Sequence, residues 1–309
     1  MPQIPQDRSS VLMMNNAKYV EYVLNFCTRE IANDGNDITT EFLLGDHDEE
    51  KSAGITARMS GILAGREEID FWNASSGEKL SISWKYADGD AFHEHENICD
   101  LRGSAKTILQ WERMMLSILS RMSGIATETK KIADVLPPGV FVAATRKTLW
   151  GMLDKKAVAV GGGLSHRLGL SDAILVKENH LALFPEGIEK VAHLIANAKT
   201  FEKNNFGSFW EIEVETASDL FSLLKVLQKQ SPEWPGVLLL DNFSAKEIRN
   251  IFSEISKAKY HQKNIFFEAS GGIHAENFME YAHSGVDVIS CGFLTHSAGS
   301  IDLSLRILP

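Results

Sequence analysis

Residues 140–180 read VFVAATRKTLWGMLDKKAVAVGGGLSHRLGLSDAILVKENH, and this stretch decides the fold. Two short apolar runs, residues 140–144 and 173–176, are each followed at once by polar and basic residues. Short apolar runs with polar flanks are typical of buried parallel strands. The basic side chains would then stand at the carboxyl ends of two strands, which is where α/β barrels hold their active sites.

The same pattern continues along the second half of the chain. Further apolar runs predict strands at residues 210–214, 237–240, 265–267 and 286–289. Amphipathic segments between them predict helices at residues 187–201, 217–230, 244–260 and 275–283. Ser244 and Glu247 have the spacing of a capping box at the start of one of these helices. Six strands are fewer than the eight of a complete barrel, so the pattern predicts an incomplete or irregular α/β barrel.

The first half of the chain has a different pattern. A helix is expected at residues 17–31, and alternating stretches predict strands at 52–63 and 80–86. A second apolar stripe at helical spacing covers residues 104–122 and predicts a helix that links two domains. We therefore expect a small α+β domain ahead of the barrel, which begins after Pro137-Pro138-Gly139.

Composition limits the possible partners and setting. The 309 residues carry 31 Lys and Arg against 41 Asp and Glu, a net charge of -10 that opposes binding to nucleic acid or to an anionic membrane. The three cysteines are scattered and indicate neither a disulfide framework nor a zinc site. The sequence has neither an apolar run of about 18 residues nor a signal-peptide core, so we expect a cytoplasmic protein.

Cationic residues form the first candidate site. Arg146, Lys147, Arg167 and Lys177 follow predicted strands or a glycine-rich turn, and together they predict a pocket for a polyanion, with His166 as a further hydrogen-bond donor. A solvated basic turn and a purely structural histidine are the alternatives. A lysine at a strand end of a barrel can also form a Schiff base, which leaves a lyase as a further possibility for Lys177.

Acidic residues and glycines supply the second part of the predicted site. Glu211, Glu213 and Glu215 alternate along one predicted strand and share a face, where something cationic must balance them. Glu211 and Glu215 are alternatively residues of the barrel rim. Ser270-Gly271-Gly272 and Ser290-Cys291-Gly292 follow the last two predicted strands and indicate a phosphate-binding cradle. Gly161-Gly162-Gly163 is less specific, because a flexible turn would also explain it.

The order and spacing of these pieces resemble the quinolinate phosphoribosyltransferase family, also called carboxylating nicotinate-nucleotide pyrophosphorylases. The resemblance covers nearly the whole chain. It rests on Gly35-Asn36-Asp37-Ile38-Thr39-Thr40, Glu112-Arg113, Ser123-Gly124-Ile125-Ala126-Thr127, Thr145-Arg146-Lys147-Thr148, His166-Arg167, Lys177-Glu178-Asn179-His180, Glu211-Ile212-Glu213-Val214-Glu215, Leu240-Asp241-Asn242, Glu268-Ala269-Ser270-Gly271-Gly272-Ile273 and Gly285-Val286-Asp287 through Ser290-Cys291-Gly292.

The resemblance implies an α/β fold in two parts, the type II phosphoribosyltransferase fold. An N-terminal α+β sandwich-like domain with its linking helix would occupy residues 1–135 and receive a returning C-terminal segment, residues 297–309. An open, incomplete α/β barrel, residues 136–296, would be the catalytic domain. The implied reaction joins 5-phosphoribosyl-1-pyrophosphate to quinolinate with loss of CO2, for NAD biosynthesis, and uses Mg²⁺.

The resemblance also implies roles for individual residues. Catalytic roles would fall to Lys147, Lys177, Glu213 and Asp241, with Glu213 and Asp241 reaching Mg²⁺ through water or pyrophosphate. Substrate would be bound by Arg113, Arg146, His166, Arg167, Ser270, Gly271, Gly272, Ser290 and Gly292. Arg113 would reach the pocket of a neighbouring subunit, which implies a homodimer and leaves a hexamer open. For Arg113 the alternative is a side chain that only snorkels beside the apolar stripe of its helix.

Three departures from the usual family pattern leave other activities open. Leu149-Trp150-Gly151 stands where Pro-Gly usually follows the Thr-Arg-Lys-Thr run, Ser117 replaces an asparagine, and Ser165 precedes His166. A protein of the same fold with another acceptor, such as the type found with molybdate-transport genes, is one alternative. A noncatalytic binding protein is another, although every charged position of the pattern is filled.

Overall fold

A computed structural model describes residues 4–184, 187–197, 208–230, 232, 234–258, 260 and 264–308. The chain forms two compact units. One, called here the barrel unit, contains residues 1–8, 132–147 and 164–293, and the other, called the sheet unit, contains residues 9–131, 148–163 and 294–309. These units differ from the predicted domain ranges mainly in residues 148–163, whose helix lies with the sheet unit because Asp154 binds Arg121 there.

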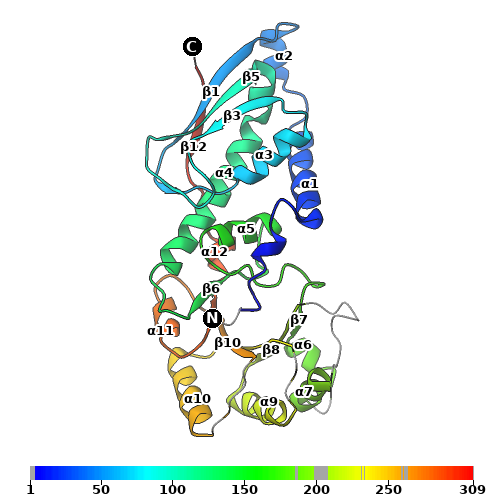
Figure 1. Ribbon diagram of the computed structural model, residues 1–309, viewed down its shortest axis with the longest axis vertical. Coiled ribbons are helices and arrows are strands. Elements are labelled where there is room, and N and C mark those ends of the chain that lie inside the picture. Colours follow the sequence, from blue (N-terminus) through cyan, green and yellow to red (C-terminus); the bar gives the residue numbers. More distant parts are fainter. Residues whose placement is uncertain are drawn as a thin grey trace. The chain divides into compact units, whose positions relative to one another are not determined.

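The barrel unit alternates strands with helices (Figure 1). Its strands are β6 (Phe141–Ala143), β7 (Ile174–Val176), β8 (Trp210–Val214), β9 (Gly236–Asp241), β10 (Ile265–Ser270) and β11 (Val288–Ser290). Its helices are α6 (Glu178–Leu181), α7 (Gly187–Asn197), α9 (Ala217–Lys229), α10 (Ala245–Lys257) and α11 (Phe278–Ala282). All six predicted strands and all four predicted helices are present, although the last residues of the helix predicted at 187–201 lie outside the described residues.

The six strands form one parallel sheet in the order β6-β11-β10-β9-β8-β7. Over the described residues, β6 and β7 end this order and do not pair, so the sheet is an open barrel. Strands β8 and β9 are almost wholly buried, as expected for parallel strands covered on both faces. Gly236 permits their pairing, because a Cβ there would lie 1.9 Å from the ring of Trp210 on the neighbouring strand.

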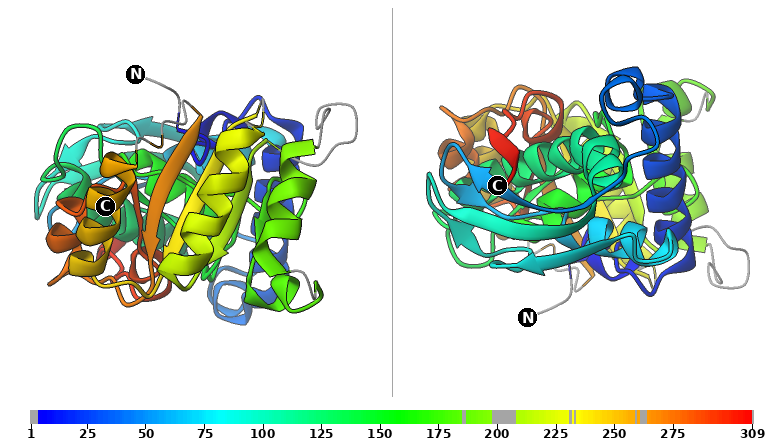
Figure 2. Two further views of the ribbon diagram at one scale, coloured as in Figure 1. Left: turned by 90° about the horizontal axis from the view of Figure 1, so that it is seen from below. Right: turned by 90° about the horizontal axis from the view of Figure 1, so that it is seen from above.

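Helices α7, α9 and α10 lie along one face of this sheet (Figure 2, left). Each carries an apolar side that is buried, such as Leu220, Leu223 and Leu227 of α9. The capping box predicted at the start of α10 is confirmed, since Ser244 and Glu247 cap each other's backbone N–H groups. Because the strands are parallel, these helices connect strands whose carboxyl ends all meet at one edge.

The sheet unit is an antiparallel sheet with helices (Figure 2, right). Its elements are η1 (Ser9–Val11), α1 (Ala17–Asp34), α2 (Ile38–Leu44), β1 (Glu50–Ala57), β2 (Gly61–Ile62), α3 (Arg66–Ser75), β3 (Leu80–Trp84), β4 (Ala91–Phe92), β5 (Asn97–Ser104), α4 (Ala105–Ala133, ending in the barrel unit), α5 (Met152–Val160), α12 (Phe293–His296, beginning in the barrel unit) and β12 (Leu303–Ile307). The larger sheet has the order β12-β1-β5-β3, and β2 pairs with β4. The C-terminal strand β12 thus returns to pair with β1, from Ala53 opposite Ile307 to Ala57 opposite Leu303.

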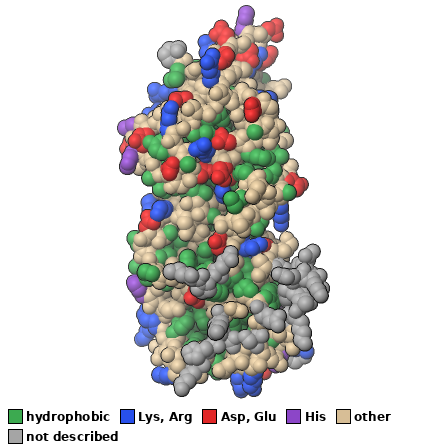
Figure 3. Space-filling view, in the orientation of Figure 1, with side chains coloured by type: hydrophobic (Ala, Val, Ile, Leu, Met, Phe, Trp, Pro, Cys, Tyr) green, Lys and Arg blue, Asp and Glu red, His purple; other side chains and the backbone are tan. Residues whose placement is uncertain are grey.

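The helix predicted at 104–122 is confirmed as α4 and continues to Ala133. On the face that Figure 3 shows, acidic and basic side chains of the described residues are intermixed. Among those residues, the helices lack the combination of length and apolar character that a membrane span requires. The fold class expected from the sequence is therefore confirmed: a mixed α+β part and an open α/β barrel.

Candidate active site

A cavity of about 610 Å³ lies at the carboxyl ends of the barrel strands. Most of the predicted site residues line it: Arg146, Lys147, His166, Arg167, Lys177, Glu213, Asp241, Ser270, Gly271, Gly272 and Ser290. They come from the ends of the strands, from the loops that follow them and, for His166 and Arg167, from the loop between α5 and β7. Residues up to 144 positions apart in the sequence are thus brought to one place (290 minus 146).

Two predicted residues do not line this cavity. Arg113 is exposed on α4 in the sheet unit, and Gly292 follows β11 without reaching the cavity surface. Several further residues that line the cavity had been given no catalytic or substrate-binding role: Thr145, Leu175, Glu178, Glu215, Leu239, Asn242 and Glu268. Trp150, at one of the departures from the family pattern, belongs to the sheet unit, where its ring packs on Phe26 at 4.9 Å.

The cations of the cavity differ in their exposure. Arg146 and Lys147 are exposed just after β6, whereas Arg167 is buried and only 5% of it is accessible. Arg167 Nη1 donates to the Ala173 carbonyl at 3.4 Å, but its buried Nε has no hydrogen-bond partner. Burial first, and then the charge of Arg146, lower the pKa of Arg167. An anion bound between these two guanidinium groups would relieve their repulsion.

Acidic groups stand opposite a lysine at the rim. Lys177, after β7, contacts Glu213 of β8 with 2.5 Å between Nζ and Oε2. Burial raises the pKa of Glu213 to about 7, although Lys177 acts in the opposite direction. Burial likewise raises the pKa of Asp241 at the end of β9, against the effect of Lys177 and Lys147. The contact with Glu213 places the Lys177 side chain at the rim of the cavity.

Carboxylates also surround His166 at the base of the cavity. His166 Nε2 lies 3.4 Å from Glu211 Oε2 and 3.5 Å from Glu268 Oε1, and both glutamates are fully buried. The backbone of His166 has a positive φ of 56°, which is uncommon for a residue other than glycine. Its Nδ1 accepts a hydrogen bond from the backbone N–H of Arg167 at 2.7 Å. The ring is thus held from both nitrogens, with Nε2 directed at the two acids.

The charge of His166 follows from these contacts. Burial alone lowers its pKa, but the charges of Glu211 and Glu268 together raise the pKa to about 10. The Arg167 N–H contact holds only while Nδ1 carries no proton, so this contact opposes the effect of the two carboxylates at Nε2. Burial favours the neutral acid in both glutamates; His166 brings the pKa of Glu268 below its usual value, while that of Glu211 stays raised.

The loop after β10 requires glycine. Gly271 has φ 89°, and a Cβ on it would lie 2.2 Å from Oδ1 of Asn242 and 2.8 Å from the Asn242 backbone nitrogen. The Asn242 N–H in turn donates to the Ser270 carbonyl at 2.9 Å. The chain after β9 and the chain after β10 therefore pack closely beside the cavity, as a backbone-lined anion cradle needs.

Among the described residues, two clusters have the composition of a cation site. Glu178, Glu213 and Glu215 place carboxylate oxygens within 4.8 Å of one another at the rim, a donor set that suits Mg²⁺. His166, Glu211 and Glu268 form the other cluster, but it is fully buried and its charges are already balanced by the imidazole and by Arg167. The rim carboxylates therefore fit a hydrated magnesium ion better than the base of the cavity does.

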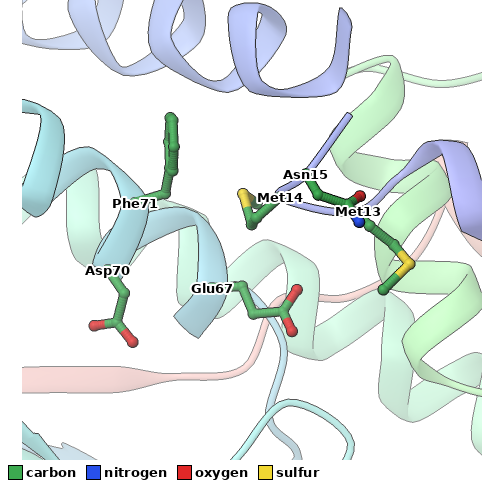
Figure 4. A pocket seen from close by; sticks show the side chains of 6 residues that line it. All are labelled: Met13, Met14, Asn15, Glu67, Asp70 and Phe71. Carbon is green, nitrogen blue, oxygen red and sulfur yellow. The ribbon is translucent and has the colours of Figure 1, made fainter. Parts of the chain in front are cut away.

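A second cavity lies in the sheet unit and has another character (Figure 4). It measures about 460 Å³ and is lined by Met13, Met14, Asn15, Glu67, Asp70 and Phe71. Its acids already have partners: Glu67 binds Lys156 at 2.9 Å, and Asp70 accepts from Trp84 Nε1 at 2.7 Å. It therefore lacks the convergent cations that distinguish the barrel cavity.

Sequence reasoning missed the base of the cavity. Glu211 was expected alternatively at the barrel rim, which is wrong, because its side chain is fully buried beside His166. Its position two residues before Glu213 on one strand was the signal, since it shares a face with Glu213 but lies deeper. Glu268 has the corresponding position on β10, because it lies two residues before Ser270 and therefore shares a face with it. Gln6, which donates to Glu268 at 2.8 Å, gave no sequence signal.

Comparison with known proteins gives a consistent result. Residues 37–123 match the N-terminal domain of quinolinate phosphoribosyl transferase, and residues 125–306 match its C-terminal domain. A probable nicotinate-nucleotide pyrophosphorylase [carboxylating] of Methanothermobacter thermautotrophicus is 37% identical over 276 residues, 88% of this chain and 93% of that protein. A quinolinate phosphoribosyltransferase [decarboxylating] of Nicotiana tabacum is 32% identical over 92% of this chain and 81% of its own length.

Solved structures agree with the sequences. The nicotinate-nucleotide pyrophosphorylase from Francisella tularensis superposes with a TM-score of 0.77 at 29% identity, and the match covers 94% of this chain and 97% of that one. Both domain matches, the curated relatives and this structure span nearly the whole chain. With the cations, acids and glycines of the barrel cavity in the expected places, the chain belongs to the quinolinate phosphoribosyltransferase family.

Proposed function

We propose that the protein transfers the phosphoribosyl group of 5-phosphoribosyl-1-pyrophosphate to the ring nitrogen of quinolinate, with decarboxylation, in NAD biosynthesis. The products are nicotinate mononucleotide, pyrophosphate and CO2. The observation that carries this proposal is the pairing of cations in the barrel cavity, where a buried Arg167 with an unsatisfied Nε stands beside Arg146. Such a pair suits an acceptor with two adjacent carboxylates.

In this reaction the bond from C1 of the ribose to pyrophosphate breaks and a bond from C1 to the ring nitrogen forms. Positive charge develops on the sugar as pyrophosphate leaves, so the protein contributes mainly orientation and charge stabilisation. The bond to the 2-carboxylate then breaks, the electron pair passes to the cationic ring, and that carbon takes up a proton. The enzyme is thus a pentosyltransferase whose acceptor loses one carboxylate.

We assign the acceptor carboxylates to Arg146 and Arg167, with His166 beneath them and Arg113 of a second subunit completing the pocket. Lys147 and Lys177 would bind the leaving pyrophosphate, and Glu213 and Asp241 would hold the sugar hydroxyls. The contact between Lys177 and Glu213 supports this division, because it keeps a cation and an anion side by side at the rim. The 5'-phosphate would lie on the loops of Ser270-Gly271-Gly272 and Ser290, with Gly292 behind.

Mg²⁺ is part of the proposal. Glu213 and Asp241 would hold the ion through water or pyrophosphate, and the carboxylates of Glu178 and Glu215 beside Glu213 give a donor set that fits it. When bound, the ion neutralises charge on the pyrophosphate. Lys147 and Lys177 would bind the same pyrophosphate.

We further propose a homodimer in the cytoplasm. Arg113 supports the dimer, because it is exposed on α4 and has no place in the cavity of its own chain. The three cysteines support a reducing compartment, since Cys27, Cys99 and Cys291 are all buried and unpaired. Sedimentation would give the mass, and a mixture of inactive Arg113→Ala and Arg146→Ala proteins would regain activity if each supplies what the other lacks.

The reaction itself is tested by incubating the purified protein with quinolinate, 5-phosphoribosyl-1-pyrophosphate and Mg²⁺. CO2 and nicotinate mononucleotide should form in equal amounts and stop when EDTA is added. Nucleotide formation without CO2, or CO2 without nucleotide, would show a different reaction. Turnover that persists in EDTA would remove Mg²⁺ from the proposal while leaving the transfer in place.

A further inference from the structure

An N-terminal segment, residues 4–8, runs through the barrel unit and is called here the strap. Ile4 is buried in a core cluster with Ala143, Leu164, Phe266 and Val288, which come from β6, β10, β11 and the loop after α5. The strap is therefore fixed against the strands that carry the site. Neither family domain match includes it, since the first begins at residue 37.

Gln6 of the strap contacts the base of the cavity directly. Its side chain is fully buried, and its Nε2 donates to Glu268 Oε2 at 2.8 Å. The other oxygen of that carboxylate, Oε1, is the one that lies 3.5 Å from His166 Nε2. A carboxylate held at one oxygen cannot rotate freely, so Gln6 fixes the direction in which Glu268 faces the imidazole.

Arg8 holds the loop on both sides of His166. Its backbone N–H donates to Ser165 Oγ at 3.0 Å, immediately before the histidine. Its guanidinium binds Asp172, with Nη2 2.8 Å from Oδ1. Asp172 Oδ2 also accepts from the backbone N–H of Leu168 at 2.9 Å, immediately after Arg167. The serine that departs from the family pattern is thus one of the anchors of the strap.

From these contacts we infer that the strap is a positioning element for the acceptor site, with Gln6 acting through Glu268 on His166. Gln6 and Arg8 act on the same loop from two directions: one orients the acid that faces Nε2, and the other fixes the backbone around the ring. This inference rests on the proposed function, because it assigns to the strap the selection of the dicarboxylate acceptor. Gln6 itself lines no part of the cavity and touches no substrate.

Four groups surround the His166 imidazole among the described residues. They are Glu211 and Glu268 at Nε2, the Arg167 N–H at Nδ1 and the ring of Phe209, 6.2 Å away between centroids. Glu211 has both oxygens unpaired apart from this ion pair, so it offers no fixed orientation of its own. Among these groups, Glu268 alone receives a hydrogen bond from the strap. Loss of the Gln6 donor should therefore leave Glu268, and with it the His166 imidazole, less firmly oriented.

The test is Gln6→Met, which keeps the length of the side chain and removes its donor. We expect the KM for quinolinate to rise about tenfold, the usual effect of losing one hydrogen bond to a charged group, while the KM for 5-phosphoribosyl-1-pyrophosphate stays within about twofold. In ¹⁵N-histidine-labelled protein, the His166 imidazole resonance, identified by its absence in His166→Asn, should shift and titrate at lower pH. Added to Glu268→Gln, Gln6→Met should change the quinolinate KM little further.

Ile4→Val is the matched control, because it removes one methyl from the strap and no polar contact. It should lower the thermal midpoint without changing either KM or the His166 resonance. Equal increases in both KM values in Gln6→Met, or an unchanged His166 resonance, would overturn the inference. If Gln6→Met does not fold, Gln6→Asn, shorter by one methylene, is measured in the same way. If the wild type fails to convert quinolinate, the proposed function fails, and the His166 resonance still decides the inference.

Discussion

Two of the fully buried glutamates, Glu268 in the barrel unit and Glu68 in the sheet unit, show how the groups in direct contact with a buried acid change the effect of burial on its pKa. Glu268 in the barrel unit faces His166 and accepts from Gln6; burial favours its neutral form, but these contacts leave its pKa below the usual value. Glu68 in the sheet unit accepts from the Tyr19 hydroxyl at 2.6 Å, and burial, followed by the charge of Asp88, raises its pKa to about 7. The contacts with His166 and Gln6 thus keep the pKa of Glu268 low, whereas burial still raises the pKa of Glu211 beside the same imidazole.

The largest effect on this difference is expected when His166 is removed from the barrel unit. His166→Ala leaves Arg167 as the remaining cation beside Glu211 and Glu268, and we expect the free energy of unfolding at pH 7 to fall by about 3–5 kcal/mol. Urea denaturation measures this change. The double variant His166→Ala with Glu211→Gln should recover part of the loss, and no recovery would mean that charge compensation does not stabilise the base of the cavity.

Removing a cation nearer the opening should affect substrate more than stability. Arg146→Ala should weaken transition-state binding by about 2–5 kcal/mol, which lowers kcat/KM for quinolinate roughly 30- to 5,000-fold. The unfolding transition should not change, because the side chain is exposed. Arg146→Lys keeps the charge and loses the bidentate fork, so its kcat/KM should lie between those of the wild type and Arg146→Ala. Lys246→Ala on α10 is the control for loss of an exposed cation. Near-normal kinetics in Arg146→Ala would remove Arg146 from the acceptor site.

The sheet unit gives a prediction of pH dependence. Because the folded pKa of Glu68 is raised to about 7, its contribution to stability is complete below the unfolded value near 4.5 and is lost as the pH rises through 7. Glu68→Gln stays neutral and should escape that loss. The free energy of unfolding of the variant relative to the wild type should therefore increase by about 3 kcal/mol between pH 4 and pH 8. An equal difference at both pH values would mean that folding does not change the pKa of Glu68.

The smallest effect is expected from the partner of that glutamate. Tyr19→Phe removes the hydrogen bond to Glu68 and should lower the free energy of unfolding by about 1–2 kcal/mol. The loss should be larger at pH 8 than at pH 5, since a charged carboxylate then lacks its donor. Denaturation at the two pH values measures this difference. The same small loss at both would indicate that only the packing of the tyrosine ring matters.

The barrel strands could be predicted because their signal is local. A parallel strand buried on both faces is a short continuous apolar run, and β9 and β10 have that pattern. In the sheet unit, β5 and α3 were missed, because β5 carries Asp100 and Arg102 and α3 begins at a left-handed Gly65 without a side-chain cap. Strands exposed on one edge or face mix polar and apolar residues, so their period is weak.

The rim of the site could be predicted and its base could not. Strand ends mark the rim, which is why Lys177, Glu213 and Asp241 were placed correctly at the cavity. Depth along a strand is not visible in a sequence, and this hid the contacts of Glu211 and Glu268 with His166. The hydrogen bond from Gln6 to Glu268 joins residues 262 positions apart, beyond the reach of any periodic pattern.

The most direct test of the account is a competition between acceptors. Quinolinate and nicotinate differ by one carboxylate, and the cations of the barrel cavity are assigned to two. With 5-phosphoribosyl-1-pyrophosphate and Mg²⁺, we expect nucleotide to form from quinolinate with one CO2 for each nucleotide, and nicotinate to react at least about a hundredfold more slowly. Equal or faster reaction of nicotinate would contradict the assignment of the cations, as would the absence of reaction with quinolinate.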